Sequence, residues 1–160
     1  MEIKDKLKLF AVCRPHVIAA YGYGSGVFKQ QGYEENDHPQ LDLILVVDDI
    51  VKFHKENMEQ NPNDYSFIGK VFYNISSKET IKGMNGVTYQ SHIEELGSTF
   101  KYGVVEFDDL EHQLLTWEHF YLPGRFQKPI LEVIGNRRLS SAIEENRHYA
   151  LMTALQFMHD

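Results

Sequence analysis

Hydrophobic residues recur at helical spacing in some segments of the chain and form continuous runs in others. Ile3, Leu7 and Phe10 lie three or four positions apart and predict an amphipathic helix over residues 2–13. The run Leu41–Val47 is apolar apart from one carboxylate and predicts a central strand covered on both faces. The chain therefore combines helices with at least one fully buried strand.

The same reasoning divides the rest of the chain. Further strands are predicted at Val17–Tyr21, Val87–Tyr89, Thr99–Phe107 and Ile130–Ile134. Further helices are predicted at Ile50–Gln60, from Asp64 as N-cap to Tyr73, from Asp108 or Asp109 to Phe120, and from about Leu139 to the end. Residues 31–40 are expected to form a loop, and Leu122–Gly124 to break the helix before them.

The turn after the first predicted strand is the first candidate for chemistry. Three alternating glycines and a serine occupy residues 22–26, and Asp42 begins the central strand some fifteen residues later. Glycines allow backbone N–H groups to approach phosphates closely, and a carboxylate on a strand can hold the Mg²⁺ that neutralises them. Gly24 and Ser25 would then cradle phosphates and Asp42 would bind metal. The alternative is a plain glycine turn beside an aspartate that caps or pairs.

A second metal-binding carboxylate is not found on the central strand. Nucleotidyltransferase strands usually carry acidic residues at positions i and i+2, which share a face, but residue 44 is Ile. Asp48 shares the face of Asp42 but lies about 20 Å along the strand, too far to share an ion. The next long strand offers Glu106 as a candidate ligand. Lys101, near the start of that strand, could place an ammonium on a triphosphate.

A polar stripe without formal charge runs along the predicted helix at 50–60. His54, Asn57 and Asn61 fall at i, i+3 and i+7, and Tyr65 and Ser66 could extend the same surface. Amide, imidazole and hydroxyl groups suit the binding of a base or of sugar hydroxyls. A capping or interhelical hydrogen-bonding role explains the stripe equally well.

Composition limits the classes of partner and compartment. The 160 residues are 42% hydrophobic and carry a formal charge of −7, which disfavours broad binding to nucleic acid or to an anionic bilayer. Arg125 and Lys128 belong to a late basic cluster that is either a solvated face or an anion site. Cys13 is the only cysteine, which excludes an intrachain disulfide. The sequence shows no signal peptide and no apolar span, so we expect a cytoplasmic setting.

Several motifs in fixed order resemble one known family. They are YGYGSGVF at residues 21–28, DLILVVD at 42–48, FHKENMEQNPNDYS at 53–66, FKYGVV at 100–105, Trp117, and YLPGRFQKP at 121–129. Together they resemble the mitochondrial translocator assembly and maintenance family of CDP-diacylglycerol synthases, the phosphatidate cytidylyltransferases. Helix-forming residues continue to the end of the chain, so we expect a compact or C-terminally shortened member.

The resemblance implies a fold and a reaction. The expected fold is α/β (α+β): a polymerase-β-like nucleotidyltransferase domain over residues 1–108, followed by a small helical, winged-helix-like part over 109–160. The expected reaction transfers CMP from CTP to phosphatidate with Mg²⁺, giving CDP-diacylglycerol and pyrophosphate. A nucleotidyltransferase with a non-lipid acceptor and a non-catalytic CTP-binding module remain as alternatives.

The residue patterns and the resemblance together give the expected site residues, of which the resemblance itself implies Gly24, Ser25, Asp42 and Lys101. The catalytic pair is Asp42 and Lys101, and the metal ligands are Asp42 and Glu106. The nucleotide-binding residues are Tyr23, Gly24, Ser25, His54, Asn57, Tyr65 and Ser66, and the lipid phosphate falls to Arg125 and Lys128. Family members attach peripherally to membranes, on the matrix side of the mitochondrial inner membrane in eukaryotes. We expect such surface contact here and no nucleic-acid partner.

Overall fold

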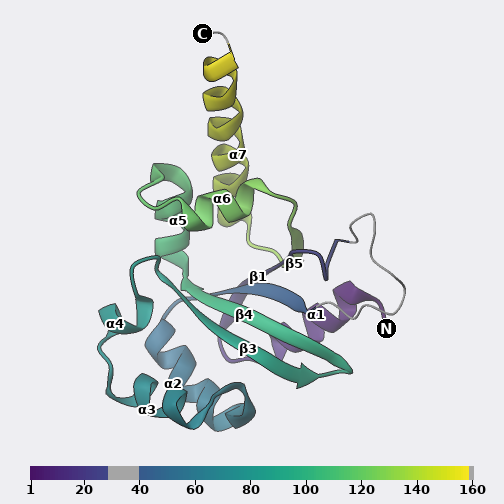
Figure 1. Cartoon of the computed structure of the whole chain (residues 1–160), viewed down its shortest axis with the longest axis vertical. Helices are drawn as coiled ribbons and strands as arrows, with labels where there is room; N and C mark the ends of the chain where they lie inside the picture. Colours follow the sequence, from purple (N-terminus) through teal and green to yellow (C-terminus); the bar gives the residue numbers. More distant parts are fainter. Residues whose placement is uncertain (29–39, 159–160) are drawn as a thin grey trace.

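Strand β2 (Leu41–Val47) is the middle strand of a five-stranded mixed sheet with the order β3-β4-β2-β1-β5. The computed structural model describes residues 1–28 and 40–158 (Figure 1). The other strands are β1 (Val17–Tyr23), β3 (Val87–Glu95), β4 (Ser98–Glu106) and β5 (Leu131–Ile134). Strand β2 is parallel to β4 and antiparallel to β1, whereas the β3–β4 and β1–β5 pairs are antiparallel.

Helices cover both faces of this sheet (Figure 1). The helical elements are α1 (Ile3–Val12), α2 (Ile50–Gln60), the 3₁₀ turn η1 (Pro62–Asp64), α3 (Phe67–Ile75), α4 (Lys78–Lys82), α5 (Phe107–Thr116), α6 (Tyr121–Gln127) and α7 (Arg137–Met158). The predicted strand at Leu41–Val47 and the predicted helix at Ile50–Gln60 are confirmed residue for residue. The mixed α/β class is therefore confirmed as well. The predicted loop at 31–40 lies outside the described residues, apart from Gln40.

The side chains of β2 alternate between two separate hydrophobic cores, one on each face of the sheet. Leu43 and Leu45 pack with Phe10 of α1 and Phe53 of α2 on one face, which we call the α2 face. Ile44 and Val46 pack on the opposite face against α5, α6 and the first half of α7, which we call the α6 face. Because side chains alternate along a strand, Asp42 belongs to the α6 face.

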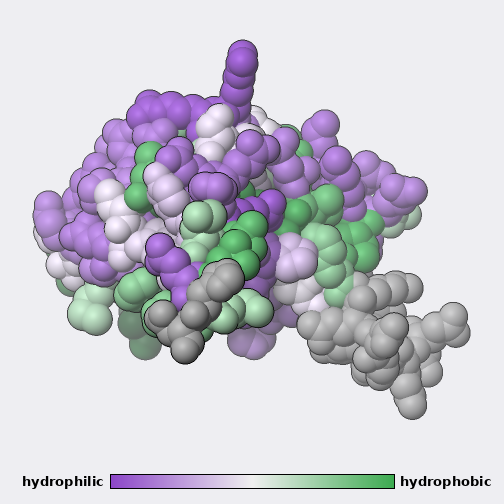
Figure 2. All heavy atoms as spheres, turned by 90° about the horizontal axis from the view of Figure 1, so that it is seen from above, coloured by the Kyte–Doolittle hydropathy of each residue, from purple (hydrophilic) through white to green (hydrophobic). Residues whose placement is uncertain are grey.

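Helix α7 packs on the sheet only through its first half and then extends away from the body of the molecule (Figure 1). Its buried residues end at Asn146. Seen from above, hydrophilic residues cover most of the visible face, with hydrophobic residues between them (Figure 2). Among the helices of residues 1–28 and 40–158, none has both the length and the apolar character needed to cross a membrane.

Helix α3 begins later than its sequence suggested. Its N-cap is Ser66, whose hydroxyl accepts a hydrogen bond from the Gly69 amide at 3.1 Å. Asp64, which we predicted as the cap, is buried and pairs instead with Arg14. For Asp64, the ion pair with Arg14, fifty residues away in the sequence, therefore takes the place of the predicted capping of the helix.

The region after β4 also differs from prediction. The helix predicted to reach Phe120 ends at Thr116, where Trp117 takes the left-handed backbone conformation with φ 55°. The predicted helix breaker Leu122–Gly124 lies inside α6. Pro123 is tolerated there because it is the third helical residue, whose N–H would have no intrahelical partner.

The proposed division at residues 108 and 109 stays a prediction. Strand β5, from the later part, pairs with β1 at one edge of the common sheet. Residues from the predicted second part, including Leu114 and Phe126, also complete the core of the α6 face. The two parts thus share one sheet and one core.

Candidate active site

Asp42 lies where β1, β2 and β4 meet on the α6 face. Strand register places it opposite Tyr23 on β1 and opposite Lys101 on β4. The side chains of all three alternate to the same face. Parallel pairing of β2 with β4 therefore brings together a carboxylate and an ammonium that are 59 positions apart in the sequence (101 − 42).

The glycine turn passes directly over the Asp42 carboxylate. Gly24 has φ 82°, and a Cβ built on it would lie 2.9 Å from Asp42 Oδ2. The amides of Val27 and Phe28 donate to the Gly24 carbonyl oxygen at 3.2 and 3.0 Å, which closes a tight turn. A side chain at position 24 would thus meet both an unfavourable backbone conformation and the carboxylate. The structure brings Gly24 and Asp42 together, with Ser25 next in the turn.

Two cations flank the same carboxylate. Burial raises the pKa of Asp42, and the charges of Lys101 and Arg125, with a 3.4 Å hydrogen bond from Gln40, oppose that rise. Arg125 reaches the site from α6 and places its guanidinium 4.3 Å from the centre of the Tyr23 ring. A half-buried carboxylate between two cations matches what a metal-bound polyphosphate requires.

Arg125 retains hydrogen-bonding capacity. Its Nε is buried and finds no hydrogen-bond partner among the residues that the structure describes. Lys128, the other residue predicted for the lipid phosphate, is exposed just after the end of α6. Its carbonyl oxygen accepts a 3.4 Å hydrogen bond from Arg147 of α7. Arg125 therefore lies at the Asp42 site, whereas Lys128 lies on the neighbouring surface.

Glu106 is not brought to this site. It pairs with Val47 at the other end of the β2–β4 ladder, on the α2 face, about 16 Å along the strand from Lys101. Its carboxylate accepts hydrogen bonds from Lys78 and Lys82 at 2.7 Å and from the Ile50 amide at 2.9 Å. These bonds lower its pKa although burial acts in the opposite direction. Glu106 and Asp42 cannot share one ion, so we leave Glu106 out of the site.

Among the described residues, no acidic cluster takes the place of Glu106 beside Asp42. Within residues 1–28 and 40–158, no group of three or more His, Cys, Asp or Glu side chains could hold a metal ion. Mg²⁺ is commonly bound by one or two carboxylates together with substrate phosphates and water. Asp42 fits that minimal pattern, with the remaining ligands supplied by substrate and solvent.

The polar stripe of α2 faces away from Asp42. His54 and Asn57 are buried on the α2 face, where the Asn57 amide donates to Asp64 at 3.2 Å, to Tyr65 at 3.0 Å and to Tyr102 at 2.9 Å. His54 Nδ1 and the Tyr65 hydroxyl are 2.9 Å apart. Burial lowers the pKa of His54 to about 3, so its imidazole stays neutral at physiological pH. The placement of His54, Asn57 and Tyr65 therefore favours a structural hydrogen-bonding role over contact with a nucleotide.

This network is anchored by a buried ion pair. Arg14 contacts Asp64 through Nε at 3.2 Å and through a terminal nitrogen at 3.0 Å, and it also reaches Glu95 at 2.8 Å. The Tyr102 hydroxyl donates to Asp64 at 2.7 Å. Ser66 lies at the exposed start of α3, where it acts as the helix cap. The Arg14–Asp64 pair could not be predicted from the sequence because its partners are not close in the chain.

Two tyrosines that the sequence did not single out complete the Asp42 site. Tyr89 of β3 and Tyr121 of α6 join their hydroxyls at 2.6 Å above the sheet. Lys101 Nζ lies 5.0 Å from the centre of the Tyr89 ring. Predicting these contacts requires the β3–β4 register, which contains an irregularity between Gln90 and Ile93.

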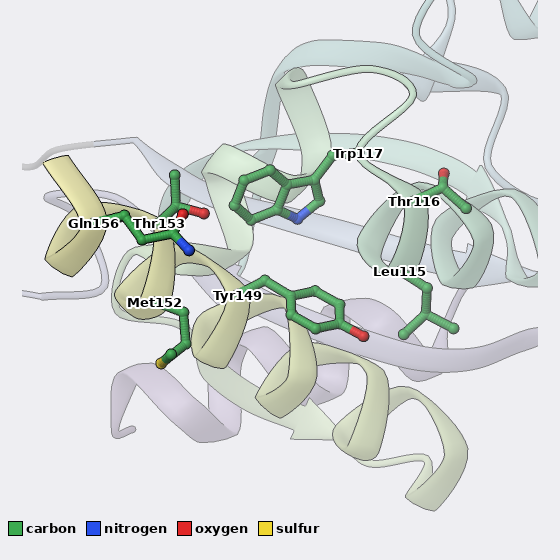
Figure 3. A pocket seen from close by; sticks show the side chains of 7 residues that line it. All are labelled: Leu115, Thr116, Trp117, Tyr149, Met152, Thr153 and Gln156. Carbon is green, nitrogen blue, oxygen red and sulfur yellow. The ribbon is translucent and has the colours of Figure 1, made fainter.

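A separate hollow of about 300 Å³ lies between the end of α5 and α7 (Figure 3). Figure 3 shows Trp117 and Tyr149 reaching it from these two elements. Its other lining residues are Leu115, Thr116, Met152, Thr153 and Gln156. None of the residues predicted for catalysis or nucleotide binding lines this hollow.

Comparisons with known proteins find a matching family and several relatives that all carry the same name. A sequence model of the family described as "Phosphatidate cytidylyltransferase, mitochondrial" matches residues 7–160. A protein of that name from Schizosaccharomyces pombe is 37% identical over 160 residues, which covers 99% of this chain and 41% of the relative. The Saccharomyces cerevisiae protein is 38% identical, with 82% and 36% covered. The human protein is 36% identical, with 84% and 30% covered. The chain thus spans about two fifths of the first of these relatives.

Proposed function

The chain belongs to the mitochondrial phosphatidate cytidylyltransferase family, and from this premise we propose that it transfers CMP from CTP to phosphatidate. A phosphate oxygen of phosphatidate attacks the α-phosphorus of CTP. The bond from that phosphorus to the β-phosphate oxygen breaks, so the products are CDP-diacylglycerol and pyrophosphate. The attacking oxygen is already ionised, and the reaction needs no strong general base.

One observation carries the proposal: Gly24, Asp42, Lys101 and Arg125 converge on one end of the α6 face. Catalysis of phosphoryl transfer consists mainly of positioning and of stabilising charge. Here the glycine turn offers close backbone approach to phosphates, and two cations can hold two polyanions beside each other.

Asp42 would hold Mg²⁺ in this proposal. When bound, the ion neutralises charge on the triphosphate. Lys101 would bind the same triphosphate, and Tyr23, Gly24 and Ser25 would line the nucleotide. Arg125, with its unpaired Nε, would bind the phosphate of phosphatidate, and Lys128 would extend that contact on the surface.

The lipid substrate and product imply work at a membrane surface. We propose peripheral contact with the mitochondrial inner membrane on its matrix side, in keeping with relatives that are named mitochondrial. Phosphatidate would then be taken from the bilayer surface and CDP-diacylglycerol returned to it.

A second candidate is a module that binds CTP without turnover. It is favoured by the position of Glu106 at the other end of the ladder, which leaves Asp42 as the one predicted metal ligand at the site among the residues that the structure describes. Such a module would retain the glycine turn and both cations but would lack the metal ligation that catalysis requires.

Pyrophosphate release from CTP and Mg²⁺, with and without phosphatidate in detergent micelles, tests the proposal. Asp42→Asn should abolish release while leaving the circular dichroism spectrum unchanged. Asp48→Asn, an exposed carboxylate just beyond the same strand, is the matched control and should retain activity. CTP binding without release would favour the module, and wild-type activity in Asp42→Asn would remove that residue from the mechanism.

A further inference from the structure

Three tyrosines form a connected platform on the α6 face. Tyr23 ends β1, Tyr89 lies on β3 and Tyr121 begins α6. The Tyr89 and Tyr121 hydroxyls are 2.6 Å apart, and their rings meet at 90° with centres 6.4 Å apart. The Tyr89 side chain also lies beside that of Tyr23. One side chain thus links β1 and α6 across the strands that carry Asp42 and Lys101.

A glycine on the neighbouring strand makes room for Tyr89. Tyr89 pairs with Gly103 in the β3–β4 ladder. A Cβ at Gly103 would lie 2.8 Å from Tyr89 Cε1 and 3.0 Å from Ile44 Cδ1. Since real Cβ atoms do not approach this closely, the Tyr89 ring can lie over the sheet only because residue 103 has no side chain.

The platform holds both cations of the site. Lys101 Nζ lies 5.0 Å from the centre of the Tyr89 ring. The Arg125 guanidinium lies 4.3 Å from the centre of the Tyr23 ring and 6.0 Å from that of Tyr121. These distances are those of cation–π contacts, in which the face of a ring attracts a positive charge.

Holding cations on rings has a chemical consequence. Among the described residues, neither Lys101 nor Arg125 lies within 4.0 Å of a carboxylate oxygen. A carboxylate partner would cancel part of the charge and occupy the N–H donors, whereas a ring fixes the cation and leaves most donors available. The platform therefore presents two positive charges beside Asp42 that remain available to phosphates.

We propose that Tyr89 is a positioning residue for cytidylyl transfer. Its ring supports Lys101, and its hydroxyl bonds to that of Tyr121 at the start of α6 and thereby fixes the place of Arg125. The two cations are thereby held beside Asp42, where the triphosphate and the acceptor phosphate would both bind. This role rests on the proposed function and adds a residue that makes no contact with the reacting atoms.

A double-mutant cycle on the full 160-residue chain tests the role. Tyr89→Phe keeps the ring and removes the hydroxyl contact with Tyr121, so it should lower kcat/KM for phosphatidate about tenfold in the wild-type background. In an Arg125→Ala background it should lower that value less than about twofold, because the cation that it positions is gone. A residue that merely stabilised the fold would cause the same loss in both backgrounds.

A second variant and a control complete the experiment. Gly103→Ala keeps every hydroxyl but displaces the Tyr89 ring, and it should reproduce the loss and the coupling to Arg125. Tyr149→Phe, which alters an exposed tyrosine of α7, should leave kcat/KM unchanged. Equal losses from Tyr89→Phe in both backgrounds, or no loss at all, would overturn the inference.

The two proposals fail in different ways. If the wild-type chain makes no CDP-diacylglycerol, the proposed function fails. The coupling between Gly103→Ala, which displaces the Tyr89 ring, and Lys101→Ala is then measured as the affinity for CTP with Mg²⁺ by calorimetry, because Lys101 is the cation assigned to the triphosphate. Non-additive losses of affinity would still support the platform, and additive losses would overturn it.

Discussion

Replacing Arg14 by methionine should lower the free energy of unfolding by about 3 kcal/mol. Arg14 is 3% exposed and donates to both oxygens of Asp64, which is 6% exposed. Burial alone would lower the pKa of Arg14, but its bonds to Glu95 and Asp64 outweigh burial and raise it. The guanidinium therefore stays charged and bonded to Asp64, and its removal leaves the buried Asp64 carboxylate without a cationic partner.

The size of the effect follows from what remains around Asp64. Breaking a buried pair by removing one partner costs about 3–5 kcal/mol. The lower end applies because Asp64 keeps hydrogen bonds from Asn57 and from the Tyr102 hydroxyl. Glu95 contributes little to the loss, since its side chain is 31% exposed and can be solvated. Methionine has similar length and fills most of the vacated volume.

Urea denaturation followed by circular dichroism measures the change. With a slope of about 2 kcal/mol per molar, the midpoint should fall by about 1.5 M, and the melting temperature by about 6–12 °C. Lys52→Met is the control, because Lys52 meets Glu56 at 4.0 Å on the surface and should change stability by less than about 0.5 kcal/mol. A loss in Arg14→Met within 1 kcal/mol of that control would refute the reasoning, a threshold well above the usual worth of a surface pair.

Two further changes test the site and the network. Gly24→Ala should lower kcat/KM by about tenfold or more, because the added methyl displaces the Asp42 carboxylate. Gly97→Ala has the same backbone strain at φ 66° with no atom nearby, and should retain activity; equal losses would point to strain alone. Burial holds the pKa of His54 near 3, against about 6.5 in the unfolded chain, so unfolding takes up a proton between those values and stability falls as pH falls. His54→Gln should remove the uptake of about one proton on unfolding and so flatten the dependence of the free energy of unfolding on pH between about pH 7 and 5. Exposed His148→Gln should not. An unchanged slope in His54→Gln would contradict the burial argument.

Local pattern was enough to predict the central strand that carries Asp42 and the helix that follows it. Strand Leu41–Val47 is a continuous apolar run, and the helix Ile50–Gln60 starts at Asp49, whose side chain accepts from two backbone amides. For the strand and the helix, the information lies within a few residues. The structure also brings Gly24 and Asp42 together, as the hypothesis of a shared phosphate and metal site expects.

Contacts that depend on strand register were not predictable in the same way. Lys101 and Glu106 were both assigned to the site, yet five residues of extended strand separate them, and only Lys101 pairs with Asp42. Tyr89 reaches the site because it pairs with Gly103, a match that depends on how β3 is offset against β4. Hydrophobic pattern fixes which face a residue occupies, but not its neighbour on the next strand.

The place of β5 in the sheet has a consequence for how the chain folds during synthesis. Strand β1 leaves the ribosome before β5, and its outer edge is covered only when Leu131–Ile134 pair with it. Until then the nascent chain carries an open strand edge, which can pair with other chains. Because closure joins segments more than a hundred residues apart, we expect the last step to be slow and to benefit from a chaperone.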